Sequence, residues 1–136
     1  QFCLSEARLG LLPATIAPYV IRALGEQAAR RWFVTAERFS ARQAQAMGFV
    51  HEVVAADALD AKVAEIVAAL VANGPAAVRA CKQLVKDMAG RPIDEALRAE
   101  TARRIADIRA SAEGREGVQS FLNKRAPSWQ AQDKPQ

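Results

Sequence analysis

The chain has 136 residues, 51% of them hydrophobic and 25% charged, which suffices for one domain with a core but not for two ordinary ones. No stretch approaches the roughly 20 continuous apolar residues that cross a bilayer, so we expect no membrane partner. The net charge of +4 suits an anionic small ligand. It does not predict nucleic-acid binding, because the basic residues alternate with acidic ones and lack interleaved aromatic residues.

The cysteine and histidine content argues against a metal centre. Cys3 and Cys81 have no CxxC spacing, and His51 is the single histidine of the chain. A Cys/His metal site is therefore not expected, and the two thiols indicate a reduced, cytoplasmic protein.

Two segments have the pattern of β-strands. The first lies within Gln1–Leu12, where a short alternation of apolar and polar residues runs into a turn at Pro13, and the second is Gly48–Val54. Because two strands do not make a stable sheet alone, we expect further strands upstream of this sequence.

Three short helices are predicted between these strands. Pro13–Leu24 should end at Gly25, and Pro18 should end, kink or restart it. Glu26–Thr35 forms the second helix. The third begins at a capping box that starts with Ser40 and closes at Gly48.

From Asp57 the pattern is helical throughout. Four helices are expected: one capped at or near Asp57 and ended by Gly74, one from Pro75 to Gly90, one opened by Pro92 with Arg109 near its end, and one over about Glu113–Asn123. Asn73-Gly74-Pro75 predicts a stop followed by a new start, and Pro92 is expected to open the third of these helices. Residues 130–136 have the composition of a polar tail.

Few residues suggest chemistry when they are considered without any family. His51 is more typical of a structural or surface histidine than of a catalytic one. Glu6 lies at a predicted strand end between Leu4 and an apolar run, and burial there favours a neutral carboxyl that can transfer protons near neutral pH. An ordinary exposed glutamate on a loop fits the local pattern at least as well.

Five segments, in order, resemble the enoyl-CoA hydratase/isomerase (crotonase) family. Residues 2–13 (FCLSEARLGLLP) are similar to the family segment F-x-x-P-E-x-x-L-G-x-x-P, and residues 22–25 (RALG) to R-x-x-G. Residues 35–41 (TAERFSA) resemble L-T-G-x-x-x-x-A, and residues 44–50 (AQAMGFV) resemble A-x-x-x-G-L-V. Residues 115–127 (REGVQSFLNKRAP) resemble EG-x-x-A-F-x-x-K-R-x-P.

The resemblance implies the C-terminal portion of an α/β crotonase (ClpP/crotonase-like) fold, mostly helical in this chain. Residues 1–56 would end the core spiral domain, and residues 57–129 would form a helical trimerisation region. Glu6 would be the catalytic residue at C2 of an acyl-CoA thioester, while Phe121 and Lys124 would contact CoA. Acyl-CoA would be the substrate, with no metal or other cofactor, in a homo-trimer or hexamer.

Departures from the family pattern refine these expectations. Ser5 replaces the usual proline, and residues 13–20 (PATIAPYV) resemble bacterial methylglutaconyl-CoA hydratases of leucine breakdown. The family's oxyanion-hole loops and first glutamate belong to its N-terminal half and have no counterpart here, so residues 1–136 are expected to be inactive alone. An enoyl-CoA isomerase and a non-catalytic helical assembly or CoA-binding module remain as alternatives.

Overall fold

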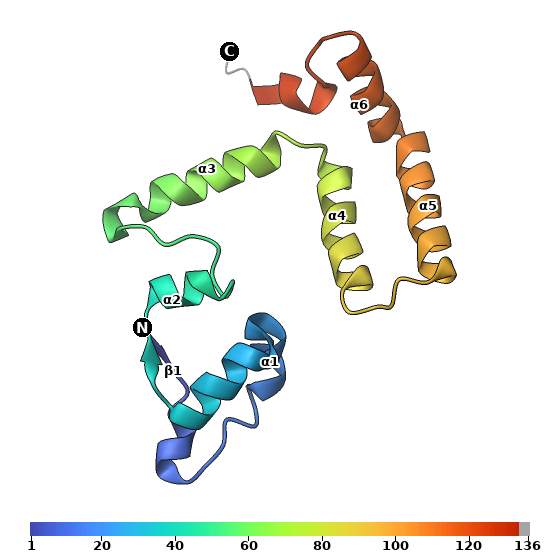
Figure 1. Cartoon of the computed structure of the whole chain (residues 1–136). Coiled ribbons are helices and arrows are strands. Elements are labelled where there is room, and N and C mark those ends of the chain that lie inside the picture. Colours follow the sequence, from blue (N-terminus) through green and yellow to red (C-terminus); the bar gives the residue numbers. More distant parts are fainter. Residues whose placement is uncertain (134–136) are drawn as a thin grey trace. The chain divides into compact units, whose positions relative to one another are not determined.

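A computed structural model describes residues 1–133 of the chain, which divides into two compact units, Gln1–Leu59 and Asp60–Gln136. In the first unit, β1 (Phe2–Cys3) pairs with β2 (Arg38–Phe39) in an antiparallel sheet, with Phe2 opposite Phe39. The other elements of this unit are η1 (Glu6–Leu9), α1 (Ala17–Thr35), α2 (Ala41–Ala46) and η2 (Ala56–Ala58) (Figure 1).

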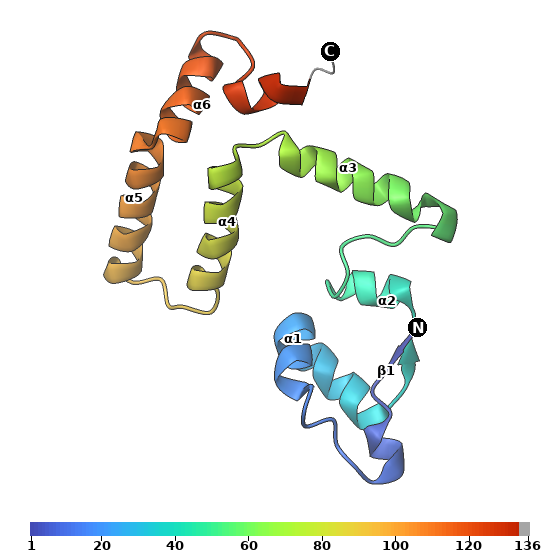
Figure 2. The same cartoon turned by 180° about the vertical axis from the view of Figure 1, so that it is seen from behind.

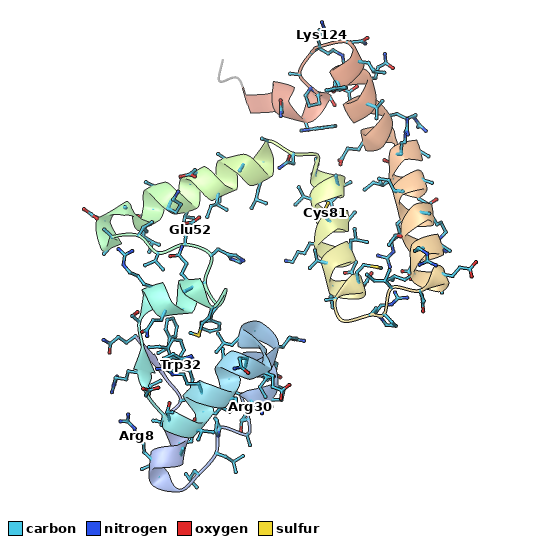
Figure 3. All side chains as sticks on the ribbon, viewed as in Figure 1. Arg8, Arg30, Trp32, Glu52, Cys81 and Lys124 are labelled. Atoms are coloured by element: carbon cyan, nitrogen blue, oxygen red, sulfur yellow. The ribbon has the colours of Figure 1, made fainter. Side chains whose placement is uncertain are left out.

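An aromatic cluster forms the core of the first unit. Leu4, Trp32, Phe39 and Ala44 are buried together. The Phe39 ring centroid lies 5.2 Å from that of Phe2 and 4.8 Å from that of Trp32. Trp32, labelled in Figure 3, also directs its indole N–H to the Met47 sulfur at 3.0 Å. This core fixes β1 against α1 and α2, so the segment that follows β1 starts from a rigid base.

The predicted strand at Gly48–Val54 is wrong, because this segment is irregular. Gly48 has a left-handed backbone (φ 74°) after α2, and the Phe49 N–H donates to the Ala44 carbonyl. The side chains of Phe49 and Val50 pack against the core cluster instead of extending a sheet. Their apolar character reflects burial. A short apolar run is found both in buried strands and in loops that pack on a core, so it does not distinguish the two.

The predicted helices of the first unit differ from the structure mainly at their starts. Helix α1 begins at Ala17, with Pro18 in its first turn, rather than at Pro13. The predicted stop at Gly25 is confirmed as a break inside α1, where the backbone turns to φ 78°. The capping box of α2 is also confirmed, because the Ser40 and Gln43 side chains each accept the other's backbone N–H.

The second unit is helical. Its elements are α3 (Leu59–Val71), α4 (Pro75–Met88), α5 (Glu95–Ala110), α6 (Ala112–Leu122) and η3 (Ser128–Asp133). Helices α4 and α5 lie side by side in both Figures 1 and 2. An ion pair between Asp87 of α4 and Arg104 of α5 joins them at 2.8 Å.

Two boundaries in this unit correct the sequence analysis. Helix α5 begins at Glu95 rather than Pro92, because the Asp94 side chain accepts the Leu97 N–H and caps the helix there. The predicted polar tail is helical at its start, since η3 extends to Asp133; residues 134–136 lie outside the described residues. Trp129 and Gln130 donate to the Ala72 carbonyl, a contact across 57 or 58 residues that no local pattern reveals.

Helix α3 keeps its apolar side chains exposed. Between 44% and 59% of the surface of each is accessible: Leu59, Val63, Ile66, Val67, Leu70 and Val71. Within residues 1–133, no single helix has the length and apolar composition to cross a membrane. Residues 56–71 and α4 have the required length and apolar composition only when they are taken together, and the chain bends by 104° between them.

Candidate active site

Glu6 opens η1, the short 3-10 helix that follows β1 and Leu4. The residue is half-buried, and its Oε2 atom is buried without a hydrogen-bond partner among the described residues. An unsatisfied buried carboxyl oxygen is unfavourable, and such atoms are rare outside functional sites and water sites. Glu6 is therefore not the ordinary exposed loop glutamate that its local pattern allowed.

The turn that carries Glu6 is closed by backbone hydrogen bonds. The Leu11 N–H donates to the Glu6 carbonyl at 3.0 Å, and Gly10 adopts the left-handed conformation (φ 70°) that ends η1. Contrary to the expected apolar enclosure, Leu9 and Leu12 are about three-quarters exposed. One oxygen of the Glu6 carboxyl is thus buried, while the apolar side chains that follow it in the sequence stay exposed.

Arg8 anchors this turn to a distant part of the chain. Its guanidinium donates to the Ala36 carbonyl at 2.7 Å, and the Cys3 thiol approaches the same oxygen at 3.5 Å. Ala36 itself has a left-handed backbone (φ 50°), which is uncommon for a residue other than glycine. Sequence analysis missed Arg8, because its partner lies 28 residues away and carries no recognisable side chain.

Phe121 and Lys124 lie at the C-terminal end of α6 in the second unit. The Lys124 N–H donates to the Phe121 carbonyl at 3.1 Å, and the Arg125 N–H donates to the Ser120 carbonyl at 3.0 Å. These two bonds form a Schellman motif with Lys124 in its left-handed position (φ 52°). Phe121 is 82% exposed, and Figure 3 shows Lys124 on the turn after α6.

A carboxylate stabilises the segment after this turn. The two Glu116 oxygens accept from the two Arg125 Nη atoms at 2.6 and 2.8 Å, and Oε1 also accepts the Ser128 N–H at 2.9 Å. The Arg125 guanidinium, followed by the Ser128 N–H, lowers the pKa of Glu116 to about 2. Glu116 is therefore ionised at neutral pH, and it ties residues 125–128 to α6.

The structure brings Phe121 and Lys124 together on one turn, and it places Glu6 in the other unit. His51 is exposed and lies outside any strand. Its backbone carbonyl accepts a hydrogen bond from the Gln45 side-chain amide. Within the described part of the chain, no three His, Cys, Asp or Glu side chains gather in a way that could hold a metal ion.

The family model of enoyl-CoA hydratase/isomerase matches residues 1–132, so the chain belongs to this family. A crystal structure of an enoyl-CoA hydratase from Shewanella pealeana is 44% identical and superposes with a TM-score of 0.84, over 94% of this chain and 48% of that one. The predicted crotonase fold is thereby confirmed.

Curated relatives agree with this assignment. A mevalonyl-coenzyme A hydratase of Aspergillus fumigatus is 33% identical over 132 residues, which are 94% of this chain and 48% of the relative. A 2,3-dehydroadipyl-CoA hydratase of Escherichia coli is 29% identical over 131 residues, 95% of this chain and 51% of the relative. The chain thus spans about half the length of the relatives that it matches.

Proposed function

We propose that the chain is the C-terminal half of an enoyl-CoA hydratase in which Glu6 transfers the proton at C2 of the acyl chain. The observation that carries this proposal is the buried Oε2 atom of Glu6, which has no hydrogen-bond partner among residues 1–133. A substrate proton or a reacting water would supply the missing partner. Leu9 and Leu12, exposed on the segment that follows Glu6, would offer apolar surface to an acyl chain.

The proposed reaction adds water across the C2–C3 double bond of a 2-enoyl thioester. Hydroxide adds at C3, the electron pair of the double bond moves onto the thioester as an enolate, and a proton is delivered to C2. Two backbone N–H groups of the N-terminal half would stabilise the enolate oxygen, a type of interaction that commonly contributes most to such catalysis. The first glutamate of that half would activate water. This addition changes no oxidation state overall and requires no redox cofactor.

The CoA moiety would be bound by the turn after α6. Lys124 supplies an ammonium for a phosphate, and Phe121 supplies an exposed aromatic surface. We further propose a homo-trimer or hexamer in the cytoplasm. The exposed apolar side chains of α3 support assembly, because a contiguous apolar surface is unfavourable in water.

The acyl group is the least constrained part of the proposal. The run of residues 13–20 favours a 3-methylglutaconyl group, as in leucine degradation. The names of the relatives show that this family hydrates different acyl groups, mevalonyl-derived and dehydroadipyl thioesters among them. An enoyl-CoA isomerase is the second candidate, because the matching family model includes isomerases.

The test is a Glu6→Gln substitution in the complete protein, with the family's N-terminal half ahead of Gln1. We expect kcat for hydration of crotonyl-CoA and 3-methylglutaconyl-CoA to fall by about 10² to 10⁴-fold, because one general acid-base group is lost. The Kd for CoA should stay nearly unchanged. Glu26→Gln, on an exposed part of α1, is the matched control and should leave kcat intact.

Two results would contradict the proposal. Near-normal hydration by Glu6→Gln would remove Glu6 from the reaction. Enzyme-like hydration of crotonyl-CoA by residues 1–136 alone would show that the absent half is not needed. Conversion of a 3-enoyl thioester to its 2-enoyl isomer, without hydration, would favour the isomerase.

A further inference from the structure

The backbone of Lys124 has an unusual conformation for its residue type. The C′ position of a Schellman motif is left-handed and is normally occupied by glycine, because a Cβ atom is disfavoured there. Here the position is Lys124, at φ 52°. A residue held in a sparsely populated conformation persists only where its surroundings fix it, and such residues concentrate at functional sites.

The surroundings that fix Lys124 converge on Glu116. Arg125, the next residue, donates its backbone N–H to Ser120 and both Nη atoms to the Glu116 carboxylate. Ser128 donates its backbone N–H to the same carboxylate. One side chain of α6 therefore binds the chain on the C-terminal side of Lys124, at Arg125 and Ser128, while α6 itself holds the N-terminal side.

The bidentate geometry matters for this role. An arginine fork that meets a carboxylate through two parallel hydrogen bonds fixes direction as well as distance. Because Arg125 is adjacent to Lys124, fixing Arg125 limits the backbone rotations open to Lys124. The Cα–Cβ bond of Lys124 then leaves the turn in one direction, which narrows the region that its ammonium can reach.

We propose that Glu116 is a positioning residue for CoA binding: through Arg125 it holds Lys124 in the left-handed turn that presents its ammonium to a phosphate of CoA. This inference rests on the proposed function, which assigns the phosphate contact to Lys124. Glu116 does not touch the ligand, and its negative charge alone would repel a phosphate.

Because of this repulsion, charge alone and positioning predict opposite changes in CoA affinity when Glu116 is replaced. Removing the Glu116 carboxylate raises the net charge by one, and simple attraction would then tighten CoA binding. Loss of positioning has the opposite effect, because the apparent affinity falls with the fraction of molecules whose turn is in the binding conformation.

The experiment titrates the complete protein with coenzyme A by calorimetry and measures the Lys124 backbone conformation in residues 1–136 by amide–Hα coupling and NOE in NMR spectra. We expect Glu116→Ala to weaken CoA binding by about fivefold and to remove the signature of positive φ at Lys124. Alanine favours α6, so the helix itself should remain. Arg125→Lys, which keeps the charge and loses the fork, should fall between the wild type and Glu116→Ala.

Two further variants separate positioning from other effects. Glu100→Ala removes a carboxylate of α5 that pairs with Arg91 and Arg104, so it makes the same charge change at another site and should not weaken CoA binding. Lys124→Gly keeps the left-handed backbone but lacks the ammonium. In that background, Glu116→Ala should cause no further loss, because both act through the same group.

The possible failures are distinguishable. If Lys124→Gly weakens CoA binding but Glu116→Ala leaves it unchanged or tightens it, the positioning role is overturned while the phosphate contact stands. If the wild type does not bind CoA, or Lys124→Gly binds as tightly as the wild type, the proposed contact fails and the inference fails with it.

Discussion

The two units of this chain are stabilised in different ways. The first unit buries an aromatic cluster around Trp32 and Phe39. In the second, the buried residues among those described are Gly74, Leu97 and Ser120, while most apolar side chains remain exposed. Its helices are instead joined by polar contacts, such as Asp87–Arg104 between α4 and α5 and the Glu113 carboxylate of α6 on the first N–H groups of α4.

This difference matches the roles that we propose for the two units. A catalytic carboxyl must be held within a fraction of an ångström, which a packed core provides. A surface that assembles with other copies must keep its apolar side chains available until assembly, as α3 does. Polar contacts then preserve the helix arrangement without consuming that apolar surface.

The largest expected effect is on the core of the first unit. Phe39→Ala should lower the free energy of unfolding of residues 1–59 by about 3 to 5 kcal/mol, since it removes a buried aromatic ring from contact with Phe2 and Trp32. Native-state hydrogen exchange, followed peptide by peptide, measures the free energy of unfolding of each unit separately. Val34→Ala, at a 75% exposed position, should change the free energy of unfolding of residues 1–59 by no more than about 0.5 kcal/mol. Equal effects of the two variants would refute a packed core.

A smaller effect is expected at a polar contact of the second unit. The Glu113 carboxylate of α6 accepts the backbone N–H groups of Ala76 and Ala77, at 2.9 and 2.8 Å, and so caps α4. Glu113→Ala should destabilise α4 by about 1 to 2 kcal/mol, as the loss of a helix cap does. Hydrogen exchange of residues 75–88 measures this. Glu95→Ala, in the first turn of α5, is the control, and an equal loss there would argue against a specific cap.

Arg8 tests whether a polar contact also matters in the first unit. Arg8→Met removes the hydrogen bond to the Ala36 carbonyl and should cost about 0.5 to 1.5 kcal/mol, with faster exchange confined to residues 5–11. Arg42→Met, at an exposed position of α2, should leave that segment unchanged. Unaltered exchange in Arg8→Met would mean that the core alone fixes the Glu6 turn.

The smallest expected effect is the loss of stability on acidification, which is absent at neutral pH. Hydrogen bonds from arginines hold the pKa values of Asp87, Glu100 and Glu116 below their ordinary values in the second unit. In the first unit, only Glu37 is similarly lowered among the described residues. A depressed pKa stabilises the fold above the ordinary value, 4.5 for glutamate, and this contribution is lost as the pH falls through the folded value, about 2 for Glu116.

Amide NMR spectra recorded between pH 5 and pH 2 should therefore change further in residues 60–133 than in residues 1–59 as the pH approaches 2. Glu116→Gln should remove the part of this change that falls on residues 124–128. Simultaneous loss of both units would show that these ion pairs do not distinguish them.

Local sequence signals predicted the helices well where the cause of a boundary is local. The capping box at Ser40 and the Gly74-Pro75 start both act within a few residues, and the structure has both. The start of α5 is predicted wrongly although its cap, Asp94, is local, whereas the error at Gly48–Val54 has a long-range cause. Phe49 and Val50 are predicted to lie on a strand, but they pack on a core that includes Trp32.

The candidate site shows the same division. Glu6, Phe121 and Lys124 are predicted from motif resemblance. Glu116 also matches a motif letter, but its contact with Arg125, like the contact of Arg8, emerges only from the structure. Arg8 pairs with the Ala36 carbonyl 28 residues away, and Glu116 pairs with Arg125 nine residues away, beyond the end of α6. A motif letter shows that a residue matches the family, but the role of that residue depends on tertiary geometry.

The central claim is that Glu6 transfers the proton at C2, and isotope exchange tests it most directly. In D₂O, the complete protein should catalyse exchange of a C2 proton of 3-hydroxybutyryl-CoA, and NMR or mass spectrometry of the thioester measures the rate. The account predicts that Glu6→Gln slows this exchange by at least about 10²-fold while the Kd for CoA stays unchanged. Exchange at the wild-type rate in Glu6→Gln would contradict it.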